Sequence, residues 1–176
     1  MRAVDLVLIR FSSIDDAAAL THLHRQVPTL RLYGALQGNE VYAYAEVGMQ
    51  DRLDRVLPAA VVVSTLRCTL AITGAAAGTE APFHYVVETD VLPEQDADFN
   101  AWYDSEHLPG LAAVPGTVSA ARYVRGGGSP RYHACYDLAS LETFGSPAWL
   151  AVRGTEWSSR VRPHFRNTKR TMFRRL

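Results

Sequence analysis

The sequence has no excess of charge of either sign: 18 lysine and arginine residues balance 18 aspartate and glutamate residues. Without a net charge, the chain exerts no long-range field that would attract nucleic acid or an anionic membrane. Long hydrophobic runs are absent as well. The longest, residues 57–63, is far shorter than the about 20 residues of a membrane-spanning helix. We therefore expect no nucleic acid and no membrane among the partners of this protein.

Cysteine is scarce, and the two copies have no paired spacing. Cys68 and Cys135 lie far apart, each at an apolar-flanked strand position, and no C-x-x-C pattern occurs. This usage is typical of buried, reduced thiols in a cytoplasmic protein. The N-terminus runs straight into a strand pattern with an acid at Asp5, which argues against a signal peptide. Cytoplasmic localisation is the resulting prediction.

The common motifs of phosphate binding and of serine nucleophiles are missing too. No G-x-x-x-x-G-K-S/T, G-x-G-x-x-G or G-x-S-x-G pattern occurs, and the glycines at 126–128 have no following helix. His22 and His24 are two residues apart and face different ways on a predicted helix, so they do not form a metal pair. We expect no metal site.

The first 74 residues predict the order β-α-β-β-α-β. Apolar, β-branched or alternating stretches mark the strands, and Ser12 to Asp16 supplies caps and acids for a helix that Pro28 ends. Gly38-Asn39 is a hairpin turn signal. The predicted strands are 4–11, 30–36, 41–47 and 65–73, and the predicted helices are 12–26 and 51 to about 58.

The same order repeats after residues 75–82, a small-residue stretch that ends in Pro82 and predicts a linker. The second set has strands at 83–91, 117–124, 131–138 and 168–174, and helices from 93 to Pro109-Gly110 and over 141–164. This predicts an α+β protein with two tandem ferredoxin-like units, 1–74 and 83–176. Each sheet has helices on one face only, so the bare faces can pack together as an α/β barrel. That barrel can form within one chain or between the chains of a homodimer.

The strand 83–91 has two different faces. Phe83, Tyr85, Val87 and Val91 form an apolar face that belongs under the helices. The other face carries His84, Val86, Glu88 and Asp90. Each titratable group left unpaired in a dry core would cost about 1–3 kcal/mol, against a total stability of about 5–15 kcal/mol. This face is a solvated surface, a sheet interface with polar contacts, or a ligand cavity.

Neighbouring strands can extend the polar face of strand 83–91 into a pocket. Arg122 lies on strand 117–124, and either Tyr132 or His133 can join from strand 131–138. Such a pocket, with His84 and Glu88, suits a small, partly polar organic ligand. In this hypothesis Arg122 holds an anionic group and Tyr132 donates a hydrogen bond.

The stretch from Phe99 to Gly110 is the most distinctive part of the chain. Phe99, Trp102, Tyr103, Glu106 and His107 share one helix face. His107 falls in the last predicted turn, where the helix dipole favours an imidazolium, and it can act as acid or base with Tyr103 as hydrogen-bond donor. The alternative is that Trp102 and Tyr103 are core residues and His107 caps carbonyl groups.

These residues carry a resemblance to a known family. W-Y-D-S-E-H-L-P-G-L, followed by V-P-G-T-V-S-A-A-R-Y, resembles the dimeric α/β-barrel superfamily near its EthD-like members. The resemblance implies a barrel that binds small aromatic or polyketide-like molecules, and it picks out Tyr103, His107, Pro109, Arg122 and Tyr123. The first half has no E-H-x-P element.

The resemblance leaves two functions open. One is a cofactor-independent enzyme of the monooxygenase, isomerase or lyase type, and the other is a non-catalytic ligand-binding or oligomerisation module. We expect no cofactor. Haem is the alternative, because some relatives bind it through a histidine.

The C-terminal segment 160–175 is rich in basic residues and has no acid. Such a run can bind phosphates or RNA. We interpret it instead as a solvated edge that pairs with acids elsewhere, because the aromatic platforms of an RNA-binding sheet are not evident.

Overall fold

A computed structural model describes residues 4–12, 17–57 and 61–176 of the chain. The strands are β1 (Leu6–Phe11), β2 (Arg31–Ala35), β3 (Val41–Glu46), β4 (Val62–Thr73), β5 (Phe83–Val91), β6 (Thr117–Arg125), β7 (Tyr132–Leu138) and β8 (Phe165–Arg175). The helices are α1 (Ala17–Gln26), α2 (Gln50–Val56), α3 (Asp96–Trp102), α4 (Leu108–Ala112), α5 (Pro147–Arg153) and α6 (Glu156–Val161). Shorter helical turns are η1 (Pro93–Gln95), η2 (Tyr103–His107), η3 (Leu141–Thr143) and η4 (Arg162–His164). The expected helix start at 13–16 lies outside the described residues.

The strands form one closed antiparallel barrel in the order β1-β3-β2-β8-β5-β7-β6-β4. The first four strands in sequence lie in the order β4-β1-β3-β2, and the last four repeat it as β8-β5-β7-β6. The predicted α+β fold with two sheets packed as an α/β barrel is therefore confirmed. The barrel closes within one chain.

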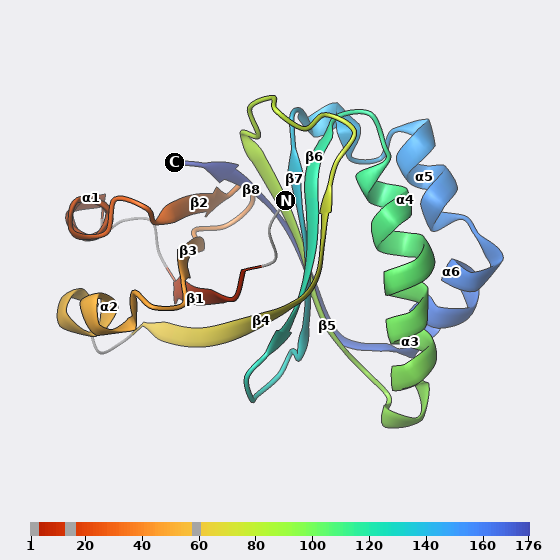
Figure 1. Ribbon diagram of the computed structural model, residues 1–176, viewed down its shortest axis with the longest axis horizontal. Helices are drawn as coiled ribbons and strands as arrows, with labels where there is room; N and C mark the ends of the chain where they lie inside the picture. Colours follow the sequence, from red (N-terminus) through yellow and green to blue (C-terminus); the bar gives the residue numbers. More distant parts are fainter. Residues whose placement is uncertain (1–3, 13–16, 58–60) are drawn as a thin grey trace.

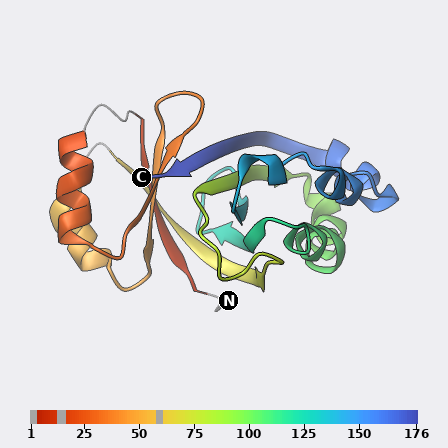
Figure 2. The ribbon, with the colours of Figure 1, turned by 90° about the horizontal axis from the view of Figure 1, so that it is seen from above.

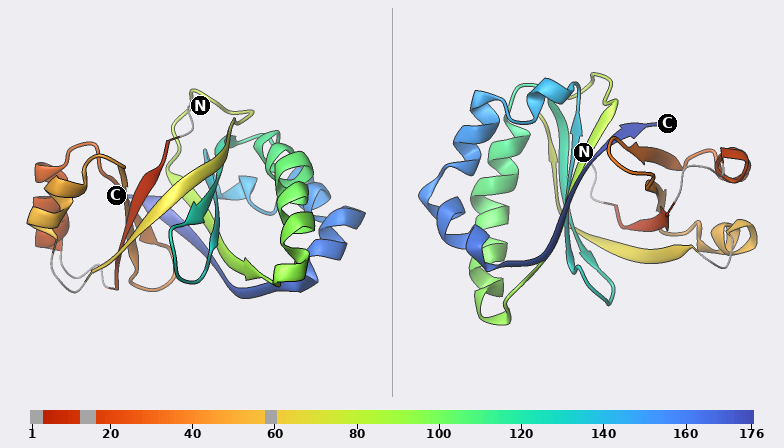
Figure 3. Two further views of the ribbon diagram at one scale, coloured as in Figure 1. Left: turned by 60° about the horizontal axis from the view of Figure 1, so that its bottom comes forward. Right: turned by 180° about the vertical axis from the view of Figure 1, so that it is seen from behind.

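Two long strands join the halves of the barrel. β4 pairs first with β1 and then, from Leu66 onward, with β6. β8 pairs with β5 along most of its length and with β2 through Phe173, Arg174 and Arg175. Figures 2 and 3 show both strands crossing from one half to the other. Each half thus covers an exposed strand edge of the other, and a closed barrel leaves no edge unpaired.

Helices cover the barrel on two opposite sides (Figure 1): α1 and α2 flank the first half, and α3 to α6 flank the second. Three apolar clusters follow from this layering. One lies under α1 and α2 and includes Val7, Leu23 and Leu53. A second fills the barrel and includes Leu8, Tyr44 and Phe173. The largest lies between β5 to β7 and helices α3 to α5.

The faces of β5 are as predicted. Tyr85 and Val87 pack in the cluster under the helices, whereas Val86 belongs to the cluster inside the barrel. His84 and Glu88 alternate with Tyr85 and Val87, so they lie on the barrel side together with Val86.

The predicted end of the second-half helix at Pro109-Gly110 is wrong. The helix continues through both residues to Ala112. Pro109 has no N–H to donate, and it stands at the start of α4, where a proline is tolerated. Immediately before it, the helix widens into the π-helical turn η2, in which the Leu108 N–H donates to the carbonyl of Tyr103. Such π-bulges occur frequently at functional sites.

Candidate functional site

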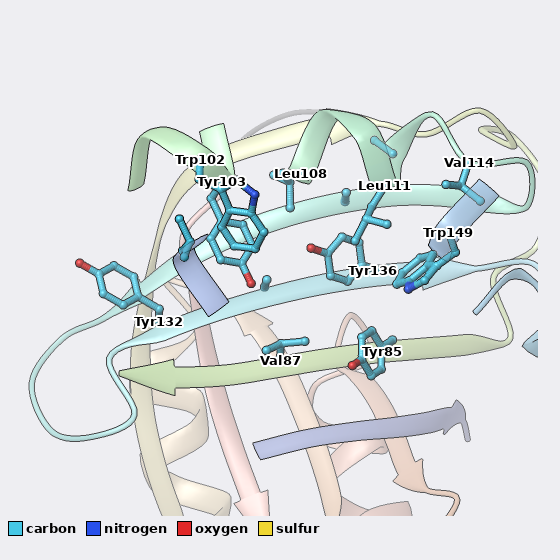
Figure 4. Packing of buried hydrophobic residues seen from close by; sticks show 14 of the residues in the cluster. Tyr85, Val87, Trp102, Tyr103, Leu108, Leu111, Val114, Tyr132, Tyr136 and Trp149 are labelled. Carbon is cyan, nitrogen blue, oxygen red and sulfur yellow. The ribbon is translucent and has the colours of Figure 1, made fainter. Parts of the chain in front are cut away.

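A small cavity lies between the outer face of the second-half sheet and its helices. Its volume is about 30 Å³, enough for one or two water molecules. Figure 4 shows the aromatic side chains that gather there from the helices and from β5 and β7. The lining residues are Tyr85, Val87, Trp102, Tyr103, His107, Leu111, Tyr136, Trp149, Arg153, Arg162, Phe165 and Arg170.

The helix holds His107 in a fixed position in this cavity. Its ring stacks on Trp102 with 4.1 Å between centroids, and it meets Tyr103 edge-on at 5.3 Å. The Trp102 indole N–H donates to Glu106 at 3.2 Å, and the Thr155 hydroxyl donates to the same carboxylate oxygen at 2.6 Å. The contact from Thr155, the residue that caps the start of α6, therefore helps to fix Trp102, and Trp102 in turn orients the imidazole.

Three buried polar atoms around the cavity have no hydrogen-bond partner among the described residues: His107 Nδ1, the Tyr136 hydroxyl and Trp149 Nε1. Leaving a buried donor or acceptor unpaired costs about 1–3 kcal/mol, and such groups are rare in native proteins. The residues that carry these three atoms line one void, where a water molecule or a polar group of a ligand can pair with them.

Burial sets the charge state of the cavity residues. It lowers the pKa of His107 to about 3, with a further contribution from the positive charges of Arg153 and Arg162. It also raises the pKa of Tyr103 to about 12. At pH 7 the imidazole is neutral and the phenol keeps its proton. The predicted imidazolium at a helix end is wrong, because the helix continues and the side chain is buried.

A larger groove lies beside the cavity. Its volume is about 640 Å³, and it shares Tyr85 and Arg170 with the cavity. The Arg170 side chain is exposed, so it can move without disturbing the core. Movement of Arg170 would open the cavity toward the groove, which has room for an organic ligand. Tyr85 is buried and packs against the rings of Tyr136, Phe144 and Trp149, so it forms the fixed wall between the two. The other groove residues are Leu36, Gln37, Glu40, Leu141, Phe144, Lys169, Thr171 and Met172.

His84 and Glu88, predicted to bind a ligand, lie inside the barrel and are paired there. Glu88 accepts hydrogen bonds from Arg10 at 2.5 Å and from the Tyr42 hydroxyl at 2.7 Å. His84 Nδ1 lies 2.7 Å from the Asp137 carboxylate, and its ring stacks on Tyr33. The face is therefore an interface with polar contacts between the two sheets, and it also borders a cavity of about 30 Å³ lined by His84, Tyr123, Asp137 and their neighbours.

Arg122 and Tyr132 lie on the helix side but do not line the cavity. The Arg122 guanidinium donates to Asn100 at 2.6 Å and Asp104 at 3.1 Å, and it lies over the rings of Phe99, Tyr103 and Tyr132. The Tyr132 hydroxyl donates to Asp96. The predicted single pocket of His84, Glu88, Arg122 and Tyr132 is therefore not formed, because the sheet separates its members.

Sequence reasoning did bring Trp102, Tyr103 and His107 together, and all three line the cavity. It missed most of the other polar groups of the lining, namely Tyr85, Trp149, Arg153, Arg162 and Arg170. The basic run 160–175 contains two of these arginines and was the available signal.

Within the described ranges, no group of three or more His, Cys, Asp or Glu side chains could hold a metal ion. None of the described helices is both long and apolar enough to cross a membrane. Cys68 and Cys135 are free thiols, and burial raises the pKa of Cys135 far above its usual range.

Haem bound through a histidine does not fit the pockets described. Its histidine ligand would have to face a void large enough for the macrocycle. His107 faces a cavity of about 30 Å³, and its ring is covered by Trp102 on one face. The groove of about 640 Å³ has no histidine in its lining.

The fold is thus a closed ferredoxin-like α/β barrel, with a candidate site between one sheet and its helices. No protein-family profile and no curated protein sequence matches the chain.

Solved structures of the same fold cover nearly the whole chain. A candidate monooxygenase from Fusobacterium nucleatum subsp. nucleatum has a TM-score of 0.70 at 11% identity, over 100% of this chain and 94% of that one. An anthrone oxidase-like protein has a TM-score of 0.65 at 15% identity, over 99% and 92%. A haem-degrading enzyme from Listeria monocytogenes has a TM-score of 0.63 at 9% identity, over 96% and 98%. At these identities the likeness concerns the fold alone.

Proposed function

We propose that the protein binds a small aromatic or polyketide-like compound in the groove that adjoins the cavity beside η2, with its reacting end directed into that cavity, and acts on it as a cofactor-independent enzyme. The observation that carries the proposal is the buried, unpaired Nδ1 of His107, which shares its cavity with two unpaired donors on Tyr136 and Trp149. The names of the fold neighbours, a candidate monooxygenase and an anthrone oxidase-like protein, support the reaction type. The W-Y-D-S-E-H-L-P stretch supports an EthD-like relationship, which is part of the proposal.

The chemistry that suits this cavity is proton abstraction. A neutral imidazole accepts a proton from an acidic C–H or phenolic O–H of the bound compound. The resulting carbanion, enolate or phenolate oxygen then accepts hydrogen bonds from the Tyr136 O–H and the Trp149 N–H, which need no rearrangement to do so. The anion and the imidazolium form an ion pair shielded from water. An electron-rich anion of this kind reacts with O₂ in a monooxygenase or is reprotonated elsewhere in an isomerase.

Anthrone is a direct test compound, because its C10–H is acidic and one fold neighbour is named for it. The overall reaction is anthrone + O₂ → anthraquinone + H₂O, with oxygen as the oxidant. We expect the protein to accelerate anthraquinone formation over the spontaneous rate. His107→Ala should lower the catalysed rate at least about 100-fold, the usual effect of losing a general base. Product formation by chromatography and oxygen uptake measure it.

His164→Ala is the matched control, because His164 lies in η4 near the same helices but does not line the cavity. It should keep the wild-type rate, and both variants should keep the wild-type melting temperature. If His107→Ala lowers the melting temperature together with the rate, the residue has a structural role and the proposed catalytic role is wrong. If neither anthrone nor other fused aromatic compounds bind at millimolar concentration in calorimetry, the proposed function is wrong.

A non-catalytic ligand-binding protein is the second candidate. It is favoured by the pKa of His107, which burial lowers to about 3, because so weak a base abstracts protons slowly until a ligand changes its surroundings. Binding without turnover of any bound compound would support it. An oligomerisation module that uses the bare sheet faces is less suitable, because those faces cover each other within one chain. A homodimer, which we keep as a proposal, would have to use an outer surface.

A further inference from the structure

Three arginines reach the cavity from three separate elements. Arg153 ends α5, Arg162 begins η4, and Arg170 lies in the middle of β8. All three line the same void together with His107 and Tyr85. A void of about 30 Å³ is thus lined both by three positively charged side chains and by aromatic rings.

These arginines have no ion pair and no hydrogen bond with any described residue. Four of the eight other lysine and arginine residues of the second half form ion pairs, among them Arg160 with Asp98 at 3.0 Å and Arg122 with Asp104 at 3.1 Å. Carboxylates are therefore available on this half of the molecule, yet no described carboxylate lines the cavity. The cluster lacks the counter-charge that these four cations have.

Three unpaired arginines around one cavity destabilise the protein when the cavity holds no anion. Burial lowers the pKa of Arg162, and the neighbouring charges of Arg153 and Arg170 lower it further. Like charges held together in a partly desolvated place repel each other, and such clusters are typical of sites that receive a charged ligand. An anion placed between them would relieve the repulsion and would accept planar, paired hydrogen bonds from the guanidinium groups.

We infer that the ligand of this cavity is an aromatic organic anion, an aryl carboxylate or a phenolate, whose charged group is held by Arg153, Arg162 and Arg170. Its ring system lies against the aromatic wall formed by Trp102, Tyr136 and other lining residues. The inference rests on the proposed function, since it names the class of compound that the same cavity takes. It goes further in requiring a negative charge on that compound.

Titration calorimetry with a matched pair of probes tests the charge requirement. 2-Naphthoate carries the carboxylate, and 2-naphthamide has the same ring and nearly the same shape without the charge. We expect the carboxylate to bind at least tenfold more tightly than the amide, because hydrogen bonds to charged groups are the stronger ones. The difference should shrink as salt is raised, because none of the three arginines is fully buried and salt screens charges near the surface.

Substitution of the arginines shows whether this cluster is responsible. Arg162→Gln should weaken 2-naphthoate binding at least tenfold and leave 2-naphthamide binding within about twofold. Its melting temperature should stay the same or rise, since a repulsive charge is removed, whereas a structural arginine would show a fall. Arg174→Gln is the matched control, because Arg174 lies on β8, as Arg170 does, but stacks on Phe83 and does not line the cavity.

The outcomes separate the inference from the proposed function. Tighter binding of the carboxylate that is lost in Arg162→Gln and kept in Arg174→Gln supports the inference. If both probes bind with equal affinity, the charge requirement is wrong, but the proposed binding of an aromatic compound is still supported. Equal loss of naphthoate binding in both arginine variants assigns the effect to general surface charge and also overturns it. If neither probe binds, the inference and the proposed function both fail.

Discussion

Glu88→Ala should lower the free energy of unfolding by about 3–5 kcal/mol, the usual cost of removing one partner of a buried ion pair. Glu88 is 1% exposed and lies on β5, whereas its partners Arg10 and Tyr42 lie on β1 and β3. These contacts cross the barrel and join its two halves. The loss of the carboxylate leaves a guanidinium and a hydroxyl without their acceptor in the interior.

Equilibrium unfolding in urea measures this effect. Glu94→Ala is the control, because Glu94 is exposed in η1 and its loss should change stability by less than about 0.5 kcal/mol. The double variant Arg10→Leu with Glu88→Leu should recover much of the loss, since a hydrophobic pair can replace a buried ion pair. A similar small change in Glu88→Ala and Glu94→Ala would contradict the closed barrel with this internal contact.

Mild acid should destabilise the protein through two buried histidines. Burial, with nearby arginines, lowers the pKa of His107 and of His133 from 6.5 to about 3 each. Below pH 6.5 the unfolded chain binds protons at both positions, whereas the folded chain does so only near pH 3. Their stabilising contribution is complete above about pH 6.5 and falls as the pH falls toward 3. At pH 5 the loss is about 2 kcal/mol for each histidine.

Urea unfolding at pH 7.5 and at pH 5 tests this sign and size. His107→Asn and His133→Asn should each remove a comparable part of the pH dependence, because the titrating group is gone. The two positions lie on opposite sides of the sheet, one under the helices and one in the barrel, so their effects should add. A pH dependence that is unchanged in both variants would show that these histidines are not buried in the neutral form.

Much of the fold could be predicted because local patterns and the fold agree. The alternation of Tyr85 and Val87 with His84 and Glu88 assigned both faces of β5, and the repeated element order gave both halves of the barrel. The helix end could not be predicted from Pro109, because a π-helical turn lets the helix absorb a proline that otherwise stops it.

The pocket on the polar face was wrong because strand register is not visible in the sequence. The pairing of β6 with β7 shifts between Thr117 and Ser119. After this shift, Ala121 and Tyr123 join the barrel interior, and Arg122 joins the helix side. A shift of one residue exchanges the faces, so Arg122 could be assigned to either side before the register was known.

The basic run shows the same limit of sequence reasoning. The interpretation as an edge paired with acids holds for Arg160 and Lys169. It is wrong for Arg162 and Arg170, which line the cavity without an acidic partner among the described residues. Arg162 and Arg170 line the same cavity as Arg153 only because of how η4, β8 and α5 pack. The spacing of these residues along the chain does not predict it.

The histidine ring signals in NMR spectra, followed from pH 8 to pH 5 with and without saturating 2-naphthoate, test the central claim most directly. His107 and His133 have similarly lowered pKa values in the free protein, but only His107 lines the cavity. Without ligand, both signals should stay constant over this range. With ligand, the pKa of His107 should rise by about 2–3 units, into the range that this titration covers, because an anion stabilises the imidazolium, and the His133 signal should not change. A ligand that shifts His133 and leaves His107 constant would place the binding site inside the barrel and contradict the assignment to the cavity beside η2.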